Sequence, residues 1–162
     1  MKILLLFLSF SVFAQLPEIK VPNEKALYII DGDSVSLKMR IYGIDTPEKK
    51  QKCQEIKGVF VDCGILAKKA LAYVFDKVHG EITITPIAFG HYGRMLVKIY
   101  RNGIDIGKSM VKAGVAFAYG SEYKVYEQEA QKEKAGFWGY YQTPQKPKLW
   151  RKKNKRKYNS KR

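Results

Sequence analysis

The sequence predicts a mixed α+β domain in which short antiparallel strands form a small barrel and helices pack around it. Segments with an apolar residue at every second position recur along the chain, and this period indicates half-buried strands. One segment with apolar residues at helical spacing, 63–78, separates the first strands from the later ones. Strands and helices do not alternate regularly, which argues against a parallel sheet. With 162 residues, the chain is long enough to bury one proper core.

The first predicted strands flank an acidic turn. Residues 26–30 are mostly apolar and end at the turn dipeptide Asp31-Gly32. From Ser34 to Tyr42 the pattern alternates, which predicts one half-buried strand or a hairpin. The apolar positions of this alternation are Val35, Leu37, Met39 and Ile41. Pro47 ends the segment because proline lacks the backbone N–H that a sheet ladder needs.

The remaining elements follow from residue period and turn residues. Lysine-rich residues 48–58 are expected to form a loop, and residues 63–78 a helix that Gly80 ends. The later expected elements are strands at 81–89 and 95–100, a hairpin turn at Asn102-Gly103, a short helix at 106–113, strand or extended chain at 115–119, a charged helix at 124–135 and an irregular segment through Pro144 to Trp150. Five short strands with about three helices favour an OB-fold barrel over residues 26–150.

Both ends of the chain differ in composition from its middle. Residues 1–14 combine Lys2, an apolar run and a small residue at the end, which is the pattern of a secretory signal cleaved after Ala14. The rival interpretation is a membrane anchor, but the apolar run is too short to span a bilayer. A polar lead follows at 15–25. Residues 151–162 contain eight Lys or Arg and no acid, which predicts a disordered tail that binds nucleic acid or an anionic membrane surface.

Export affects the interpretation of the two cysteines. Cys53 and Cys63 are ten positions apart, and an oxidising compartment favours a disulfide between them. A pair of free thiols is the alternative, and zinc is disfavoured because no His lies nearby. We expect a secreted or periplasmic monomer without stable membrane insertion once the signal is removed.

Acidic residues gather in two short motifs although the net charge of the chain is +15. Asp33 follows a glycine turn, and Asp45 ends the strand that contains Arg40. If the two strands are neighbours, both carboxylates emerge at one end of the sheet and repel each other unless a cation lies between them. Carboxylate and carbonyl oxygens suit Ca²⁺. The alternative is an ordinary turn with solvated acids, followed by a strand end at 45–47.

A cation beside arginines would bind a phosphodiester. Arg40 and Arg94 each carry a planar guanidinium that matches phosphate oxygens bidentately. Glu48 could orient or deprotonate an attacking water. The alternatives are a surface arginine in a hairpin turn and an exposed acid after a proline. Tyr92, beside Arg94, is a candidate for contact with a base or sugar.

Five ordered blocks between Tyr28 and Trp138 resemble the staphylococcal nuclease (thermonuclease) family. The blocks are DGDSVSL, RIYGIDTPE, YGRMLVKIY, GKSMVKAGVAFAY and EAQKEKAGFW. The resemblance implies an OB-fold barrel with helices and a Ca²⁺-dependent nuclease that acts on DNA and RNA. It also implies attack by water on phosphorus, which leaves 3′-phosphate ends.

Residue roles carried over by motif agree with the chemistry above. The implied Ca²⁺ ligands are Asp33, Asp45 and the backbone carbonyl of Thr46, with Asp31 beside the metal. Arg40 and Arg94 resemble the phosphate-binding arginines, and Glu48 resembles the general-base candidate. The implied nucleotide-stacking residues are Tyr92, Tyr119 and Tyr123, with Tyr119 equally expected in the core.

The sequence departs from the family pattern at one point. Only six residues separate Asp33 from Arg40, where family members usually carry a longer hairpin. Either Leu37–Met39 forms a tight turn, or one bent strand replaces the hairpin. The competing function is a non-catalytic nucleic-acid-binding module on the same fold. Retention of both acids, both arginines and the candidate base favours the enzyme.

Overall fold

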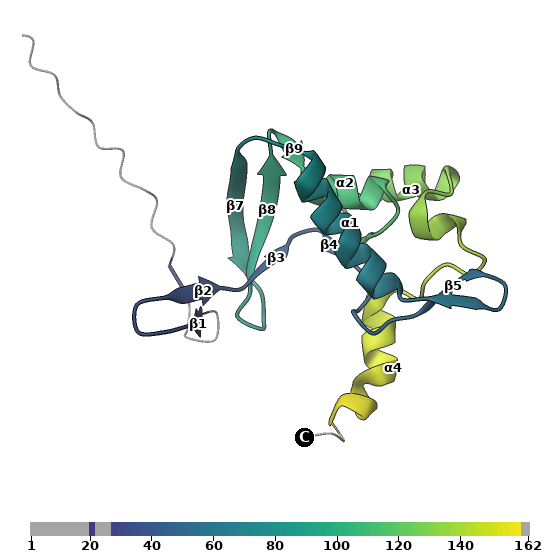
Figure 1. The fold of residues 1–162 in the computed structure, drawn as a ribbon, viewed down its shortest axis with the longest axis horizontal. Helices are drawn as coiled ribbons and strands as arrows, with labels where there is room; N and C mark the ends of the chain where they lie inside the picture. The colour runs from purple at the N-terminus through teal and green to yellow at the C-terminus, as the bar shows by residue number, and fades with distance from the viewer. Residues whose placement is uncertain (1–19, 22–26, 160–162) are drawn as a thin grey trace, which may run out of the picture.

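In a computed structural model of the chain, residues 20–21 and 27–159 are described (Figure 1). The predicted signal at 1–14 lies outside the described residues, and so does most of the lead at 15–25. Within the described part, no helix is both long enough and apolar enough to cross a bilayer.

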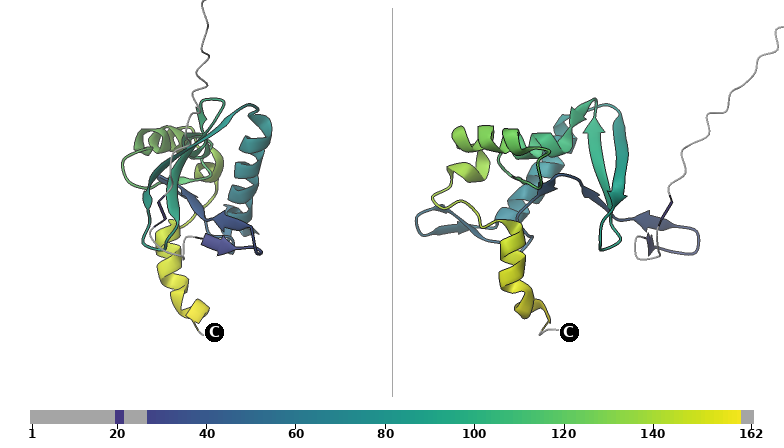
Figure 2. Two further views of the ribbon diagram at one scale, coloured as in Figure 1. Left: turned by 90° about the vertical axis from the view of Figure 1, so that its left-hand side faces the viewer. Right: turned by 180° about the vertical axis from the view of Figure 1, so that it is seen from behind.

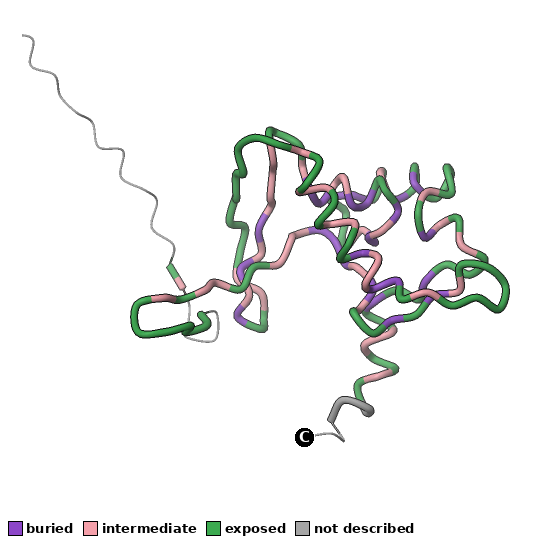
Figure 3. Tube along the Cα trace, viewed as in Figure 1, coloured by how far each residue is buried: buried purple, intermediate pink, exposed green. Residues whose placement is uncertain are grey.

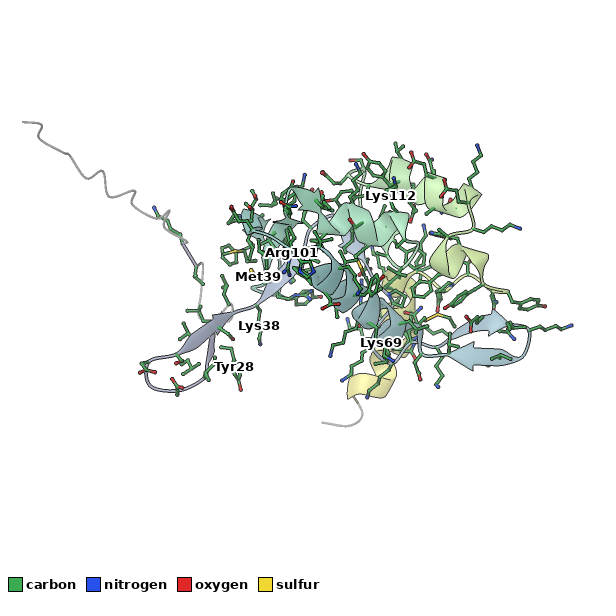
Figure 4. All side chains as sticks on the ribbon, turned by 45° about the horizontal axis from the view of Figure 1, so that its top comes forward. Tyr28, Lys38, Met39, Lys69, Arg101 and Lys112 are labelled. Carbon is green, nitrogen blue, oxygen red and sulfur yellow. A yellow bond between two sulfur atoms is a disulfide. The ribbon has the colours of Figure 1, made fainter. Side chains whose placement is uncertain are left out.

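The N-terminal strands form a hairpin that stands apart from the rest of the fold. Strands β1 (Leu27–Ile29) and β2 (Val35–Leu37) pair antiparallel around the acidic turn. This hairpin extends away from the helices in Figure 1, and most of its residues are exposed (Figure 3). Tyr28 on β1 and Lys38, directly after β2, are labelled in Figure 4, and the Lys38 Nζ lies 5.6 Å from the centroid of the Tyr28 ring.

Only Lys38 separates β2 from β3 (Met39–Ile41), which leaves the hairpin and joins the main sheet. Of the two alternatives for this segment, the structure therefore has the bent strand rather than a tight turn at Leu37–Met39. The sheet has the order β3-β8-β7, with β3 parallel and β7 (Ile82–Phe89) antiparallel to β8 (Met95–Arg101). The β7–β8 register shifts between Pro86 and Ala88, because proline cannot donate to the ladder. The predicted Asn102-Gly103 turn connects β8 to β9 (Ile104–Asp105), with positive φ at both residues.

Residues 48–58 are not the plain loop that their lysines suggested. Strands β5 (Cys53–Ile56) and β6 (Val59–Val61) form a short antiparallel hairpin, and Gly58 supplies the positive φ that its turn needs. The predicted helix is confirmed as α1 (Cys63–Lys77). The disulfide between Cys53 and Cys63 is also confirmed, with a Cα–Cα distance of 5.7 Å, and it ties the hairpin to the first residue of α1.

Short elements from the second half of the chain enclose the core beside α1. They are α2 (Ile106–Lys112), β10 (Phe117–Ala118), α3 (Lys124–Lys132) and the 3₁₀ turn η2 (Gly136–Gly139), with β10 paired to β4 (Ile44–Asp45). Buried Ile44, Met110 and Val111 pack together between these elements. Ile44 thus joins this core, and Asp45 follows it at the end of β4.

The C-terminal segment is a helix, so two predictions about it are wrong. The residues expected to be irregular up to Trp150 and disordered from 151 onward form α4 (Pro147–Asn159). Pro147 begins the helix, where its fixed φ and missing N–H are favourable. Buried Pro147 and half-buried Trp150, Arg151 and Asn154 share one face at spacings of three and four residues. Figure 1 shows α4 running from beneath α1 toward the C-terminus.

The predicted α+β class is confirmed, but the predicted barrel is not closed among the described residues. Within residues 20–21 and 27–159, the strands fall into four separate sheets, and there are four α-helices where about three were expected. Figure 2 shows the β1–β2 hairpin and the β5 hairpin at opposite ends of the molecule. The N-terminal hairpin therefore does not complete the β3-β8-β7 sheet.

Candidate active site

Asp45 is fixed in the core by the pairing of β4 with β10. It is opposite Phe117 in this antiparallel pair, and only 5% of its surface is exposed. The preceding bend requires Gly43, whose φ is +76° and whose missing Cβ would lie 2.8 Å from the Tyr123 ring. A buried carboxylate is costly unless a cation or hydrogen-bond donors satisfy it. Asp45 is therefore a preorganised position for positive charge.

The two predicted phosphate-binding arginines come from neighbouring segments and line the same pockets. Arg40 on β3 is opposite Leu96 on β8, and Arg94 is two positions before Leu96. Arg94 lies in the turn just before β8, whose first residue, Met95, pairs with Met39, the neighbour of Arg40. The Arg40 Nη2 donates to the Asp45 Oδ1 at 2.6 Å. Arg94 has no ion pair within the described part of the chain, so its guanidinium is available to an anion.

The loop that carries Glu48 is held by buried contacts on two sides. The Glu48 backbone N–H donates to the Gln51 Oε1 at 3.1 Å, and the Gln51 Nε2 donates to the Gln145 carbonyl at 2.7 Å. Gln51 is 1% exposed. On the other side, Gly64 of α1 approaches so closely that a Cβ there would lie 1.8 Å from the Glu48 carbonyl oxygen. These contacts fix the backbone from which the candidate base projects.

Arg151 of α4 is a site residue that the sequence analysis missed. Its Nη2 lies 2.9 Å from the Asp45 Oδ2, and its Nη1 lies 3.1 Å from the Asp45 Oδ1 and 2.7 Å from the Glu48 Oε1. Hydrogen bonding to Asp45, with a further bond to Glu48, raises the pKa of the Arg151 guanidinium above its ordinary value. One guanidinium therefore bridges both candidate acids.

Two adjoining pockets contain most of the predicted site residues. One, of about 420 Å³, is lined on its polar side by Arg40, Asp45, Thr46, Glu48 and Arg94. The other, of about 480 Å³, is lined by Arg40, Glu48, His91, Tyr92, Arg94, Leu96, Tyr119 and Arg151. The shared arginines and Glu48 make the pockets two parts of one cationic cleft with an acidic floor.

Asp33 does not join this cleft, contrary to the expectation that both acidic motifs meet at one end of a sheet. It lies exposed in the turn of the β1–β2 hairpin, which projects away from β4 (Figure 1). Its backbone N–H donates to the Asp31 Oδ1, and its Oδ1 accepts from the Ser34 hydroxyl. Hydrogen bonding from Ser34 is the main cause that lowers the pKa of Asp31. No group of three or more acidic, His or Cys side chains among the described residues is placed to hold a metal.

The three candidate stacking tyrosines have different environments. Tyr92 and Tyr119 are 77% and 56% exposed and line the cleft beside the arginines, so both can contact a ligand. Tyr123 is 3% exposed, and its hydroxyl donates to the Asp105 Oδ2 at 2.8 Å. Burial is the main cause that raises the pKa of Tyr123. The assignment of Tyr123 to nucleotide stacking is therefore wrong, because this residue supports Gly43 and α2 from within the core.

Two arginines, a buried aspartate and a fixed glutamate around one open cleft define a protein suited to phosphodiester chemistry. A family model described as Staphylococcal nuclease homologue matches residues 38–140. Because this match covers more than half of the chain, the chain belongs to the staphylococcal nuclease family. The resemblance seen in the sequence is thus confirmed. The matched range begins at Lys38, so Asp31 and Asp33 lie outside it.

Curated relatives agree with this membership. An "Uncharacterized endonuclease" of Escherichia coli O157:H7 is 29% identical over 142 residues, which cover 78% of this chain and 83% of the relative. The "Staphylococcal-like nuclease CAN1" of Arabidopsis thaliana is 30% identical over 125 residues, which cover 74% of this chain but 34% of the plant protein. The family and these relatives support nuclease activity, and therefore hydrolase chemistry.

Proposed function

We propose that the chain is a Ca²⁺-dependent nuclease that hydrolyses phosphodiester bonds of DNA and RNA and leaves 3′-phosphate ends. The observation that supports this most is the gathering of Arg40, Arg94, Asp45 and Glu48 around one cleft. Guanidinium groups bind phosphate oxygens, and a neighbouring carboxylate can accept a proton from water. Exposed Tyr92 and Tyr119 at the rim offer ring faces on which any base can stack, which suits a substrate range that includes DNA and RNA.

The donor atoms in the cleft suit a hard divalent cation. Oxygens of Asp45 and Glu48 both lie within 3.1 Å of a single nitrogen, the Arg151 Nη1, so the two carboxylates converge on one cationic position. Oxygen ligands of this kind are those that Ca²⁺ prefers. Asp45 and the backbone carbonyl of Thr46 would hold the ion, with Glu48 beside it. Bound there, Ca²⁺ would supply positive charge against the negative charge that develops on the phosphate.

The chain's own residues account for the remaining steps of hydrolysis. Arg40 and Arg94 bind the equatorial phosphate oxygens and stabilise their added charge in the transition state. Glu48 orients the attacking water or takes its proton. The contacts of Gln51 and Gly64 keep the Glu48 backbone fixed, which preserves the alignment of water, phosphorus and leaving oxygen.

Digestion of plasmid DNA and of RNA with Ca²⁺, with and without EGTA, tests this function. Arg40→Lys and Arg94→Lys keep the charge but remove the guanidinium fork, and each should lower kcat about 100-fold or more. Arg101→Lys, at the far end of β8, is the matched control and should retain activity. Activity that persists in EGTA would exclude the Ca²⁺ requirement. Nucleic-acid binding without hydrolysis in the wild type would favour the non-catalytic module instead.

We also propose that the chain is exported as a monomer to the periplasm or the medium. Residues 1–14 have the composition of a cleavable signal, and the Cys53–Cys63 disulfide suits an oxidising compartment. N-terminal sequencing of protein recovered from cell fractions and medium should give Gln15 as the first residue. Recovery only from the cytoplasm, with Met1 intact, would contradict export.

A further inference from the structure

Arg151 donates hydrogen bonds to both carboxylate oxygens of Asp45, the buried candidate metal ligand. Among the described residues, the Asp45 Oδ2 accepts from Arg151 alone, whereas the Oδ1 accepts from Arg40 at 2.6 Å and from Arg151 at 3.1 Å. The Asp45 side chain is 6% exposed, so water contributes little to its solvation. Arg151 is thus the main counter-charge of the acid pair in this arrangement.

The same oxygens are those that a divalent ion would need. Ca²⁺ binds carboxylate oxygens at roughly 2.3–2.6 Å, which requires direct contact with Asp45. A guanidinium that bridges Asp45 and Glu48 occupies the approach to both and repels a second cation. Arg151 and the metal therefore compete for one position.

We propose that Arg151 is an intramolecular competitor of the metal, holding Asp45 and Glu48 until Ca²⁺ displaces it and thereby setting the Ca²⁺ affinity. This inference rests on the Ca²⁺ dependence proposed above. The contact comes from α4, which lies beyond residue 140, where the family match ends.

The position of α4 makes displacement of one side chain sufficient. Buried Pro147 and half-buried Trp150 hold the first turns of the helix, whereas the Arg151 side chain is 39% exposed and has three flexible methylene carbons between its guanidinium and the backbone. Arg151 also lines the pocket of Arg40, Arg94 and Tyr92. Once released from the acids, its guanidinium stays within reach of a phosphate in that pocket and becomes a third cationic group for the substrate.

Calorimetric titration of the mature full-length chain with Ca²⁺ alone, without nucleic acid, tests the proposal. Arg151→Gln removes the charge-assisted hydrogen bonds to both acids and should lower the Kd for Ca²⁺ about tenfold or more. Arg151→Lys keeps the charge without the bidentate fork and should give an intermediate Kd. The matched control is Lys152→Gln, which removes one positive charge from an exposed neighbour on the same helix and should leave the Kd close to that of the wild type.

Amide hydrogen exchange provides a second measurement that does not depend on a variant. Addition of Ca²⁺ to the wild type should speed exchange in α4 around residues 151–155, because the helix loses its contact with Asp45. Equal Kd values for Arg151→Gln and Lys152→Gln, or slower exchange of residues 151–155 once Ca²⁺ is bound, would overturn the competition while leaving the proposed nuclease intact. Absence of Ca²⁺ binding in every variant would overturn both the metal dependence and this inference.

Discussion

Replacing Gly64 by alanine tests whether the close approach of α1 positions the candidate base. A Cβ on Gly64 would lie 1.8 Å from the Glu48 carbonyl oxygen, 2.4 Å from the Glu48 carbonyl carbon and 2.8 Å from the Lys49 Cα. All three atoms belong to the backbone, so no side chain can rotate to relieve the clash. Contacts of this type stay above 3.0 Å in proteins. The loop and α1 must therefore separate by about 1.2 Å to accommodate the methyl group.

The expected magnitudes follow from this displacement. Overpacking of a fixed backbone contact typically costs about 1–3 kcal/mol of unfolding free energy. Helix propensity alone predicts that Gly64→Ala would raise the unfolding free energy instead, because alanine in a helix is favoured over glycine by about 1 kcal/mol. A shift of about 1 Å at Glu48 should lower turnover about 100-fold.

Urea unfolding and steady-state hydrolysis of DNA with Ca²⁺ measure both effects on Gly64→Ala. Lys69→Ala changes an exposed residue of the same helix (Figure 4) and should leave stability and turnover nearly unchanged. If Gly64→Ala is as stable as the wild type, or more stable, and turns over normally, then the close contact with the Glu48 loop does not position the base.

Three further predictions concern the core, the disulfide and the C-terminus. Tyr123 keeps its proton to a higher pH in the folded state than in the unfolded state, so the unfolding free energy should fall as the pH rises above 10.0, by up to about 1.4 kcal/mol per pH unit. In urea titrations, Tyr123→Phe should reduce this slope. At pH 7 the same substitution should cost about 1 kcal/mol through loss of the hydrogen bond to Asp105. Replacing Cys53 and Cys63 together by serine should lower the unfolding free energy by roughly 3 kcal/mol, since the closed loop is short, and an unchanged midpoint in urea would contradict this. Deleting residues 152–162 should make DNA binding less dependent on salt, and equal slopes with and without them would exclude a role in substrate capture.

Much of the fold could be predicted because apolar residues recur at a regular spacing in its longest helix and strands. The helix α1 follows from apolar residues at helical spacing, and β7 and β8 follow from alternation around the His91–Arg94 turn. The β5–β6 hairpin escaped prediction because four lysines between 49 and 57 give it the composition of a loop. Its strands are too short to show a period, and the disulfide to α1 supplies the stability that their sequence lacks.

The helix α4 was missed because Pro147 suggests a break, although proline is favoured at the first position of a helix. A usable signal was present: Pro147, Trp150, Arg151 and Asn154 repeat at helical spacing, which places Arg151 on the face that packs against the protein. The partner of that face could not be found from sequence, because Asp45 lies more than a hundred positions earlier.

The acidic site could be predicted only in part. Asp45, Glu48, Arg40 and Arg94 follow from local motifs and meet in one cleft, since β3 and β8 pair directly. The position of Asp33 depends on how the chain passes from β2 to β3. Only Lys38 lies between these strands, and the β1–β2 hairpin that carries Asp33 extends away from the cleft. Motifs identify the chemistry of individual residues. Whether those residues meet in space depends here on the connection between β2 and β3, and no periodic pattern in the sequence predicts its path.

The side chain of Gln51 has a mechanical consequence for the whole site. A single buried amide binds the Glu48 backbone on one side and the carbonyl of Gln145, two residues before α4, on the other. A displacement of α4 is therefore coupled to the loop that carries Glu48 through the two hydrogen bonds of the Gln51 side chain. Substitutions in α4 and in the Glu48 loop should therefore have non-additive effects on the unfolding free energy in a double-mutant cycle. This coupling energy should vanish when Gln51 is replaced.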